Sequence, residues 1–384
     1  MKLVFICGSL EPGQDGVGDY VYILARELID LGHTCLLIAL NDQFLETSSN
    51  SKSNLFQFNS EYPALCTLRF ASCTNWCYKS RFLAEEFKYF CPDLISLQYV
   101  PYSFQMKGLP FLLLFCLGNV RSLSHWHIMA HELWVDSRSK LRNFILSTFQ
   151  KFIFTLIVRQ LHPISIDVSN MYNFCQVKDL GYPASIVPLF SNIPRSTSEI
   201  NQIRIDSSPA PDEWCFVFFG SIHEEWDHTC FFHLIETAAV ELGITVVHIQ
   251  VLGNAGAYGC QLFESISSTI PSWIHIQQTG WISDEMISIL LTKADWGVTT
   301  TPSHLLGKSG SVAAMLDHGL QVIVPRMEYV DGPWHSSFIN DFRFIPLNNQ
   351  FKERLLLRQK LSLNNSSTPF IVADHLIHLL QQLS

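Results

Sequence analysis

The chain has 384 residues, which suits two domains of ordinary size better than one or three. Hydrophobic residues make up 48% of it and charged residues only 15%, with a mean hydropathy of +0.18, which is typical of parallel sheets covered by helices on both faces. The formal net charge of −9, without a concentrated basic stretch, excludes a protein that binds nucleic acid through a basic surface.

The first hundred residues alternate between strand and helix patterns. The apolar run Leu3–Cys7 is short and lacks a small-residue cleavage site, so it predicts a first strand and not a signal peptide. A glycine-rich turn at Gly13–Gly18, a helix over Val21–Leu31 and a strand at Thr34–Leu40 follow. Two strands joined by a crossover helix predict a parallel sheet.

The rest of the first half continues this alternation. The polar segment from Asn41 to Ser60 predicts an exposed loop. The helices and strands expected after it are Phe82–Tyr89, Leu94–Gln98, Trp126–Ala130, a long helix from Lys140 to Gln160, and strands at Leu161–Ser165 and Ser185–Pro188.

The segment from Arg195 to Glu213 is rich in Ser, Pro, Asn and Asp and predicts a linker, after which the plan repeats. The expected elements of the second half are Phe216–Phe219, Phe231–Leu242, Thr245–Leu252, Trp273–Gln277, Asp284–Thr292, Trp296–Thr300, a helix ending at His318, Val322–Pro325 and His375–Leu383. The prediction is therefore an α/β protein with domains 1–194 and 214–384 joined by 195–213. The last helix belongs to the second domain or packs back on the first.

Eleven cysteines, an odd number, lie mainly within apolar stretches, as Cys7, Cys35 and Cys116 do. This predicts free buried thiols and a cytoplasmic protein, and not a disulfide framework. Cys73 and Cys77 form a lone C-x3-C without a second pair, so no zinc site is expected.

Two apolar stretches, Leu109 to Leu117 and Phe152 to Val158, are too short to span a bilayer. The helix expected over Leu141 to Leu161 carries three basic residues, Arg142, Lys151 and Arg159. We expect it to be a core helix, and the alternative is a peripheral contact with a membrane surface on the cytoplasmic side.

The glycine loop between the first strand and the first helix contains Gly16 and Gly18. Glycines at this place let a ligand approach the backbone, and the helix N-terminus favours an anion. No third glycine completes a dinucleotide-binding fingerprint, and a flexible turn without ligand is the alternative.

A second loop, Gly307-Lys308-Ser309-Gly310-Ser311, follows a strand and opens a helix. Its amides, its lysine and its two hydroxyls could bind a diphosphate. The alternative is a helix cap with a solvated lysine. Pro302 stands where a P-loop needs its leading glycine, which excludes a P-loop NTPase.

His131 and Glu132 follow a strand, at the sheet edge where open α/β folds bind ligands. His131 is therefore a candidate site residue, with a structural histidine as the alternative. The pair His125-x-His127 is expected to serve packing. The sequence has no H-E-x-x-H, no D-x-D and no G-x-S-x-G, so we expect no metal centre and no serine nucleophile.

Several segments, in this order, resemble the family-4-type glycosyltransferases of the GT-B fold, which have two Rossmann-like domains facing a cleft. They are Gly16 to Tyr20 continuing to His33, Leu97 to Tyr102, His127 to Trp134, Ser191 to Pro194, and Gly280 to Val324. The resemblance covers most of the chain, from Met1 to about Pro325.

The resemblance implies transfer of a sugar from a nucleotide-sugar donor to an acceptor hydroxyl, with retention of configuration and without metal or further cofactor. The acceptor, a saccharide, a lipid-linked saccharide or a small molecule, would bind the first domain and the donor the second. Lys308, Gly310 and Ser311 would stabilise the leaving diphosphate, and Gly16 and Gly18 would close over it.

The other implied site residues complete this picture. His131 would contact the sugar and Asp19 would orient the acceptor, while Trp281 and Ile282 would hold the nucleotide base. Ser221, Gly253, Gly307 and Ser309 would line the rest of the donor site.

Two features depart from the family. Leu306 and Ala314 stand where the family usually has two glutamates, and the loop Gly220 to Trp226 lacks the usual Arg and Lys, a loss for which Lys308 could substitute. Two alternatives therefore stay open: a catalytically silent GT-B protein that binds a partner, and another GT-B enzyme such as a sugar-nucleotide epimerase.

Overall fold

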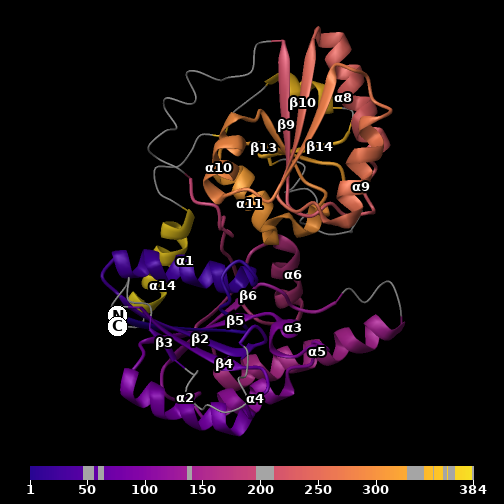
Figure 1. Ribbon diagram of the computed structural model, residues 1–384. Helices are drawn as coiled ribbons and strands as arrows, with labels where there is room; N and C mark the ends of the chain where they lie inside the picture. Colours follow the sequence, from indigo (N-terminus) through magenta and orange to yellow (C-terminus); the bar gives the residue numbers. More distant parts are fainter. Residues whose placement is uncertain are drawn as a thin grey trace. The chain divides into compact units, whose positions relative to one another are not determined.

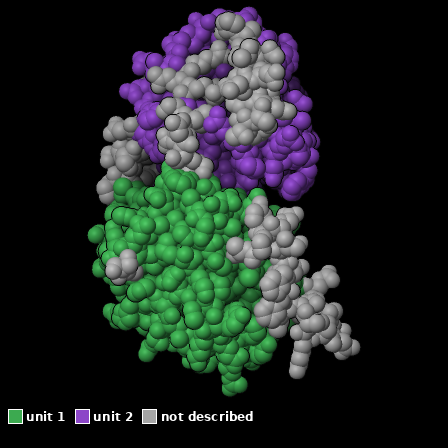
Figure 2. All heavy atoms as spheres, turned by 90° about the vertical axis from the view of Figure 1, so that its left-hand side faces the viewer, with its two compact units in different colours: residues 1–188, 366–384 green, residues 189–365 purple. Residues whose placement is uncertain are grey.

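The computed structural model describes residues 1–45, 56–58, 65–135, 141–195, 212–326, 341–348, 350–357, 361 and 368–382. The chain divides into two compact units (Figures 1 and 2). Unit 1 is Met1–Pro188 together with Ser366–Ser384, and unit 2 is Leu189–Asn365. Most of the expected linker, residues 196–211, lies outside the described residues.

Unit 1 is built on an eight-stranded sheet in the order β3-β4-β2-β1-β5-β6-β7-β8. All neighbouring strands are parallel except β3 and β4, as the crossover pattern predicts. The strands are β1 (Lys2–Cys7), β2 (Thr34–Asp42), β3 (Phe56–Phe58), β4 (Leu65–Ala71), β5 (Leu94–Tyr99), β6 (His125–Ala130), β7 (Ser165–Val168) and β8 (Ser185–Ile186).

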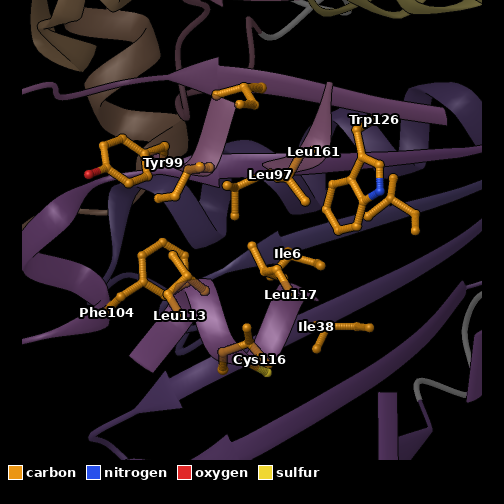
Figure 3. Close-up of a cluster of buried hydrophobic side chains, with 14 of the residues drawn as sticks. Ile6, Ile38, Leu97, Tyr99, Phe104, Leu113, Cys116, Leu117, Trp126 and Leu161 are labelled. Carbon is orange, nitrogen blue, oxygen red and sulfur yellow. The ribbon is translucent and has the colours of Figure 1, made fainter. Parts of the chain in front are cut away.

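Helices cover both faces of this sheet (Figure 1). They are α1 (Gly16–Asp30), α2 (Trp76–Phe90), α3 (Pro101–Phe104), α4 (Phe111–Gly118), α5 (Leu141–Leu161), α6 (Met171–Asp179) and α14 (Thr368–Gln381). On the α4 side, Leu113, Cys116 and Leu117 pack with Ile6 and Leu97 of the strands (Figure 3). The opposite face is covered by α1 and α14, which pack on each other.

Unit 2 repeats the plan with six parallel strands in the order β11-β10-β9-β12-β13-β14. Its elements are β9 (Glu213–Phe219), α8 (His228–Leu242), β10 (Val246–Leu252), α9 (Gly256–Ser267), β11 (Ile274–Gly280), α10 (Asp284–Lys293), β12 (Trp296–Val298), the 3-10 helix η1 (Ser303–Lys308), α11 (Gly310–Asp317), β13 (Gln321–Val324), β14 (Phe344–Pro346) and α13 (Phe351–Leu357). One core lies against α8 and α9 and a second against α10 and α11.

Several expectations about element bounds need correction. The segment from Asn41 to Ser60 is not an exposed loop throughout, because β2 continues to the buried Asp42 and Phe56–Phe58 is β3. The helix expected from Phe82 begins earlier, at Trp76.

The strand expected at Leu161–Ser165 is wrong, because α5 continues to Leu161, whose side chain is still in the core, and β7 starts only at Ser165. The helix expected from His375 begins earlier, at Thr368.

The division of the chain also differs from the expected boundary at residue 194. Unit 2 already begins at Leu189, since the backbone N–H of Ser191 donates to Asp317 of α11 at 3.0 Å. Helix α14 belongs to unit 1, where His375 meets Asp167 of β7.

Candidate functional site

Each sheet has one place where the direction of strand succession reverses. In unit 1 this place is beside β1, which lies between β2 and β5, and in unit 2 it is beside β9, which lies between β10 and β12. Open α/β sheets bind ligands at the carboxyl ends of their strands at such places. The predicted site residues lie near the carboxyl ends of the strands at these two places.

In unit 1 the glycine loop leads into the N-terminus of α1. The Asp15 carboxylate caps this helix by accepting from the backbone N–H groups of Val17, at 2.9 Å, and Gly18, at 3.2 Å. Burial raises the pKa of Asp15, although both hydrogen bonds oppose the shift. A phosphate that bound these two amides would therefore have to displace the carboxylate.

Gly16 and Gly18 have different surroundings. A Cβ on Gly18 would lie 2.7 Å from the carbonyl oxygen of Ser9, so glycine there permits close packing of α1 on the loop. A Cβ on Gly16 would meet no heavy atom within 4 Å, so this position is open to a ligand. Asp19 accepts from the backbone N–H of Gly13 at 3.0 Å and thereby closes the loop.

A buried arginine that the sequence pattern does not single out fixes the start of this loop. Arg69 of β4 donates to Asp42 of β2 at 2.7 Å and pairs with Glu11 in the loop. Asp42 also accepts from the backbone N–H of Leu10. Burial opposes ionisation of Asp42, but these hydrogen bonds hold its pKa below the ordinary value.

His131 lies buried just after β6, against the ring of Tyr20 in α1 at 5.0 Å between centroids. Its Nε2 is 2.9 Å from Oε1 of Gln98 on β5. An amide oxygen only accepts, so His131 carries its proton on Nε2 and presents Nδ1 as an acceptor. Burial lowers the pKa of His131 to about 3, and the ring is neutral at pH 7.

Gln98 is the first member of a buried polar chain across three strands. Its Nε2 donates to Oγ of Ser96 at 2.7 Å, and Ser96 Oγ lies 2.8 Å from Nδ1 of His127. His127 Nε2 meets the Asp167 carboxylate at 2.9 Å. The carboxylate can only accept, so His127 donates from Nε2 to Asp167.

His127 therefore does more than the packing expected of it. The sequence does carry a signal for this chain: polar residues recur at every second position of the apolar strands, at Ser96 and Gln98 and at Ser165 and Asp167. That period places them on one sheet face, here the face covered by α1 and α14.

In unit 2 the predicted phosphate loop lies at the edge where β9 ends. Gly220, with a φ of +90°, approaches Ser311 so closely that a Cβ would lie 3.2 Å from the Ser311 side chain. Ser309 caps α11 by accepting from the backbone N–H of Val312 at 3.4 Å and lies 3.0 Å from the Ser311 hydroxyl. Gly307 and Lys308 end η1 directly before this cap, and Gly310 is the exposed first residue of α11.

The remaining predicted donor-site residues follow neighbouring strands of unit 2. Gly253, after β10, pairs with Gly280 at the end of β11. Trp281 follows Gly280 and is 85% exposed, while Ile282 beside it packs on the core next to α10. Ser221 follows β9, where its carbonyl accepts from the Thr300 hydroxyl.

Unit 2 also supplies a cation that the sequence pattern does not predict. Arg326 follows β13 after Pro325 and is buried, with Nη2 2.6 Å from the carboxylate of Glu225. Its carbonyl accepts from the backbone N–H of Ser303 at the start of η1, whose last residue is Lys308. The backbone of Arg326 thus lies at the start of η1, and its guanidinium pairs with Glu225.

The positions that correspond to the two family glutamates are part of the core. Leu306 and Ala314 are buried in the cluster between β9, β13 and α10. The described residues contain no group of three or more His, Cys, Asp or Glu side chains that could hold a metal ion.

No protein-family model matches the chain, and no curated protein matches it significantly. Solved structures do resemble it over its whole length. UDP-GlcNAc 2-epimerase from Neisseria meningitidis bound to UDP-GlcNAc is 9% identical, with a TM-score of 0.55, and 100% of each chain is covered.

Two glycosyltransferase structures are also similar to the chain. The catalytic domain of starch synthase IV from Arabidopsis thaliana bound to ADP and acarbose is 10% identical, with a TM-score of 0.55, covering 100% of this chain and 99% of that one. Sucrose-phosphate synthase from Thermosynechococcus elongatus is 12% identical, with a TM-score of 0.52 and coverage of 100% and 99%. The chain therefore has the GT-B fold of two parallel-sheet, Rossmann-like domains.

Proposed function

We propose that this protein binds a nucleotide-sugar in unit 2 and transfers the sugar to an acceptor hydroxyl. The observation that carries the proposal is the start of helix α11 at the end of β9. There the N-terminus of α11 lies against Gly220. Helix η1 leads into α11 and ends at Lys308, and at its start the backbone N–H of Ser303 donates to the carbonyl of Arg326. A helix N-terminus and two cations provide the charge stabilisation that a leaving diphosphate needs.

In the proposed reaction, the bond between C1 of the sugar and the phosphate oxygen breaks while C1 bonds to the acceptor oxygen. The acceptor proton leaves with the nucleoside diphosphate, whose charge Lys308, Arg326 and the amides of Gly310 and Ser311 stabilise. Arg326 would exchange Glu225, an exposed carboxylate, for a phosphate oxygen. This supplies a cation that the loop Gly220 to Trp226 lacks.

His131 would contact the sugar as a neutral group. Because its pKa is about 3 and Nε2 is occupied by Gln98, it would offer Nδ1 to a sugar hydroxyl and would not act as a general base that cycles near pH 7. Asp19 would orient the acceptor, and Trp281 with Ile282 would hold the base. We propose retention of configuration, no metal and a cytoplasmic location, which suits eleven free thiols.

A second candidate is sugar-nucleotide epimerisation. It is favoured by the fold similarity to UDP-GlcNAc 2-epimerases, which equals that to the glycosyltransferases. Inverting a carbon that carries hydrogen breaks a C–H bond, so an epimerase would introduce deuterium from D2O into the sugar. A transferase would leave the sugar carbons unlabelled.

The test is a thermal-unfolding and turnover screen with UDP-, GDP-, ADP-, dTDP- and CMP-sugars in D2O. A ligand at a hundred times its Kd stabilises the fold by about 2.7 kcal/mol, which such a screen detects. For a transferase, one nucleotide series stabilises the protein, releases nucleoside diphosphate faster with an added saccharide, and yields unlabelled sugar.

Two substitutions and one control sharpen the test. Lys308→Ala and Arg326→Ala should each lower turnover by roughly 100-fold or more, the effect of removing one preorganised charge-stabilising group. Lys293→Ala, which removes an exposed lysine of α10, should leave turnover unchanged. If no nucleotide-sugar binds, the proposal is wrong and the silent binding protein takes its place.

A further inference from the structure

Helix α5 has an apolar outer side over its N-terminal part. The side chains of Leu141, Phe144, Ile145, Phe149 and Phe152 are all exposed, from 48% for Phe149 to 76% for Leu141. They recur at helical spacing and form one stripe. Thr148 is the polar residue among them, and its hydroxyl is bonded to the carbonyl of Phe144 at 2.8 Å.

The inner side of the same segment is polar. Ser147 and Gln150 are buried, and Gln150 bonds the carbonyl of Gly108 and the backbone N–H of Val135. A soluble helix normally places its apolar residues inward and its polar residues outward. From Leu141 to Phe152 this order is reversed, so the core helix expected from the sequence describes only the part of α5 from Ile153 onward.

Helix α4, which packs on α5, also has exposed apolar residues. Its residues Phe111, Leu112 and Phe115 are exposed on one side, and Met106 in the preceding loop is 85% exposed. The bond from Gln150 to Gly108 and the bond from Gln160 to Leu114 hold α4 alongside α5. We call the exposed residues of the two helices, with Met106, the α4–α5 surface.

On the two helices themselves the charged residues are of one sign, although α2, which packs on α4, carries Glu85 and Glu86. Helix α4 has no charged residue, and α5 carries Arg142, Lys151 and Arg159 and no Asp or Glu. No acidic residue occurs in the sequence from Val100 to Ala130, which includes Lys107 and Arg121. This is unusual in a chain with a net charge of −9 and complements an anionic surface.

We propose that the α4–α5 surface docks unit 1 on the surface of an anionic lipid bilayer. Aromatic and aliphatic side chains would enter the boundary between headgroups and acyl chains, and Arg142, Lys151 and Arg159 would meet anionic headgroups. In Figure 1 the N-terminal turns of α5 extend beyond the sheet of unit 1, which leaves this part accessible to a flat surface.

Docking fits the structure better than spanning. Among the described residues α5 is the one helix long and apolar enough to cross a membrane, and 33% of its most apolar window is buried. Those buried residues, with Ile153, Phe154 and Ile157 among them, pack in the unit 1 core. Spanning would remove them from the sheet, whereas docking uses only side chains that are already exposed.

The test is flotation of the purified full chain with vesicles of phosphatidylcholine alone or mixed with phosphatidylglycerol. The wild type should float with the mixed vesicles and much less with phosphatidylcholine. The double variant Phe149→Ser/Phe152→Ser should bind roughly tenfold or more weakly, because two exposed aromatic side chains are lost from the lipid contact. The double variant Arg142→Gln/Arg159→Gln should lose the preference for phosphatidylglycerol.

Phe342→Ser is the matched control, since Phe342 is an aromatic residue of unit 2 that is 62% exposed. It should float like the wild type, and all variants should keep the wild-type melting temperature because the altered side chains are exposed. Absence of wild-type flotation, or equal flotation of Phe149→Ser/Phe152→Ser, overturns the proposal. So does a wild type that forms dimers but ignores vesicles, since the surface is then an interface between two copies.

Discussion

The carboxylate of Asp167 on β7 lies 2.8 Å from Nε2 of His375 on α14, although 208 positions separate the two residues in the sequence. The contact joins α14 to β7, which lies between β6 and the edge strand β8 of the unit 1 sheet. The same carboxylate oxygen meets His127, at the end of the chain of hydrogen bonds that reaches His131. One anion thus holds both a distant helix and the orientation of a candidate site residue.

The first prediction concerns the pH dependence of this contact. The hydrogen bond to Asp167 raises the pKa of His375 above 6.5, so its contribution is complete below pH 6.5 and is lost as the pH rises through the raised pKa. His375→Ala should therefore destabilise the protein by about 1–2 kcal/mol at pH 6 and by less at pH 9. Urea unfolding at both pH values measures this.

His378→Ala on the exposed side of the same helix is the control, and it should cost little at either pH. The pKa of Asp167 determines the low pH at which the stabilising contact is lost. Burial opposes its ionisation, but His127, His375 and Ser165 hold its pKa far below 3.8, so its contribution disappears only as the pH falls through that low value. An equal loss in His375→Ala at pH 6 and pH 9 would refute the charged contact.

The second prediction concerns Lys79, which is fully buried in α2. Its Nζ donates to the carbonyl of Leu40 and lies 4.5 Å from the centre of the Trp76 ring. Burial lowers its pKa to about 8 from 10.5, so charging it costs up to about 3 kcal/mol of stability at pH 7. Lys79→Met should stabilise the protein at pH 7 by about 1–2 kcal/mol, after loss of the hydrogen bond.

The unfolded state binds more protons at Lys79 than the folded state between pH 8 and 10.5, so wild-type stability from this group rises with pH across that window. The advantage of Lys79→Met should therefore shrink when denaturant unfolding is repeated at pH 9.5. A variant less stable than the wild type at pH 7 would show that the lysine contacts outweigh its burial.

The third prediction concerns the Arg69 cluster. Arg69→Met should destabilise the protein by roughly 3–5 kcal/mol, because it leaves the Asp42 carboxylate buried without its cation. Glu11→Gln should cost about 1 kcal/mol or less, because Glu11 is 35% exposed and solvent screens it. Adding Asp42→Asn to Arg69→Met should recover part of the loss in thermal unfolding, and strict additivity would contradict the coupling.

The fourth prediction uses the two glycines of the first loop as a matched pair. Gly18→Ala should destabilise the protein by about 1–3 kcal/mol, since its Cβ would overlap the Ser9 carbonyl. Gly16→Ala meets no neighbour and should keep the wild-type melting temperature. If Gly16 approaches the donor phosphate, Gly16→Ala should still lower turnover of the nucleotide-sugar, and unchanged turnover would remove Gly16 from the site.

The α/β architecture follows from the sequence because buried parallel strands read as apolar runs separated by turns and helices, as Leu3–Cys7 and Thr34–Leu40 do. Strand β4 is not predicted, since Arg69 interrupts its apolar pattern and only the contact with Asp42 and Glu11 explains a buried arginine. The prediction of α5 as a core helix is only partly correct for a related reason. The composition of α5 shows that the helix is apolar but does not show which of its sides faces the sheet.

The candidate site is predictable only in part. The loops around Gly16 and Lys308 can be predicted from the sequence, because a loop that joins a strand to the start of a helix has a recognisable local sequence pattern. The positions of Arg326 and of the hydrogen-bonded chain from Gln98 to Asp167 depend on which strands are neighbours in the sheet. The pattern of residues along the sequence does not reveal that strand order. The pairing of Ser96 with His127 becomes meaningful only once β5 and β6 are adjacent.

Because α14 completes unit 1 after the whole of unit 2, two segments that unit 2 separates in the sequence form one folding unit. During synthesis, α14 must leave the ribosome before His375 can reach Asp167 and before α14 can cover its part of the sheet. Unit 2 lacks this dependence and can fold before α14 has been synthesised. A nascent chain that stops before Thr368 would thus expose the surface of α1 and of β7 against which α14 packs.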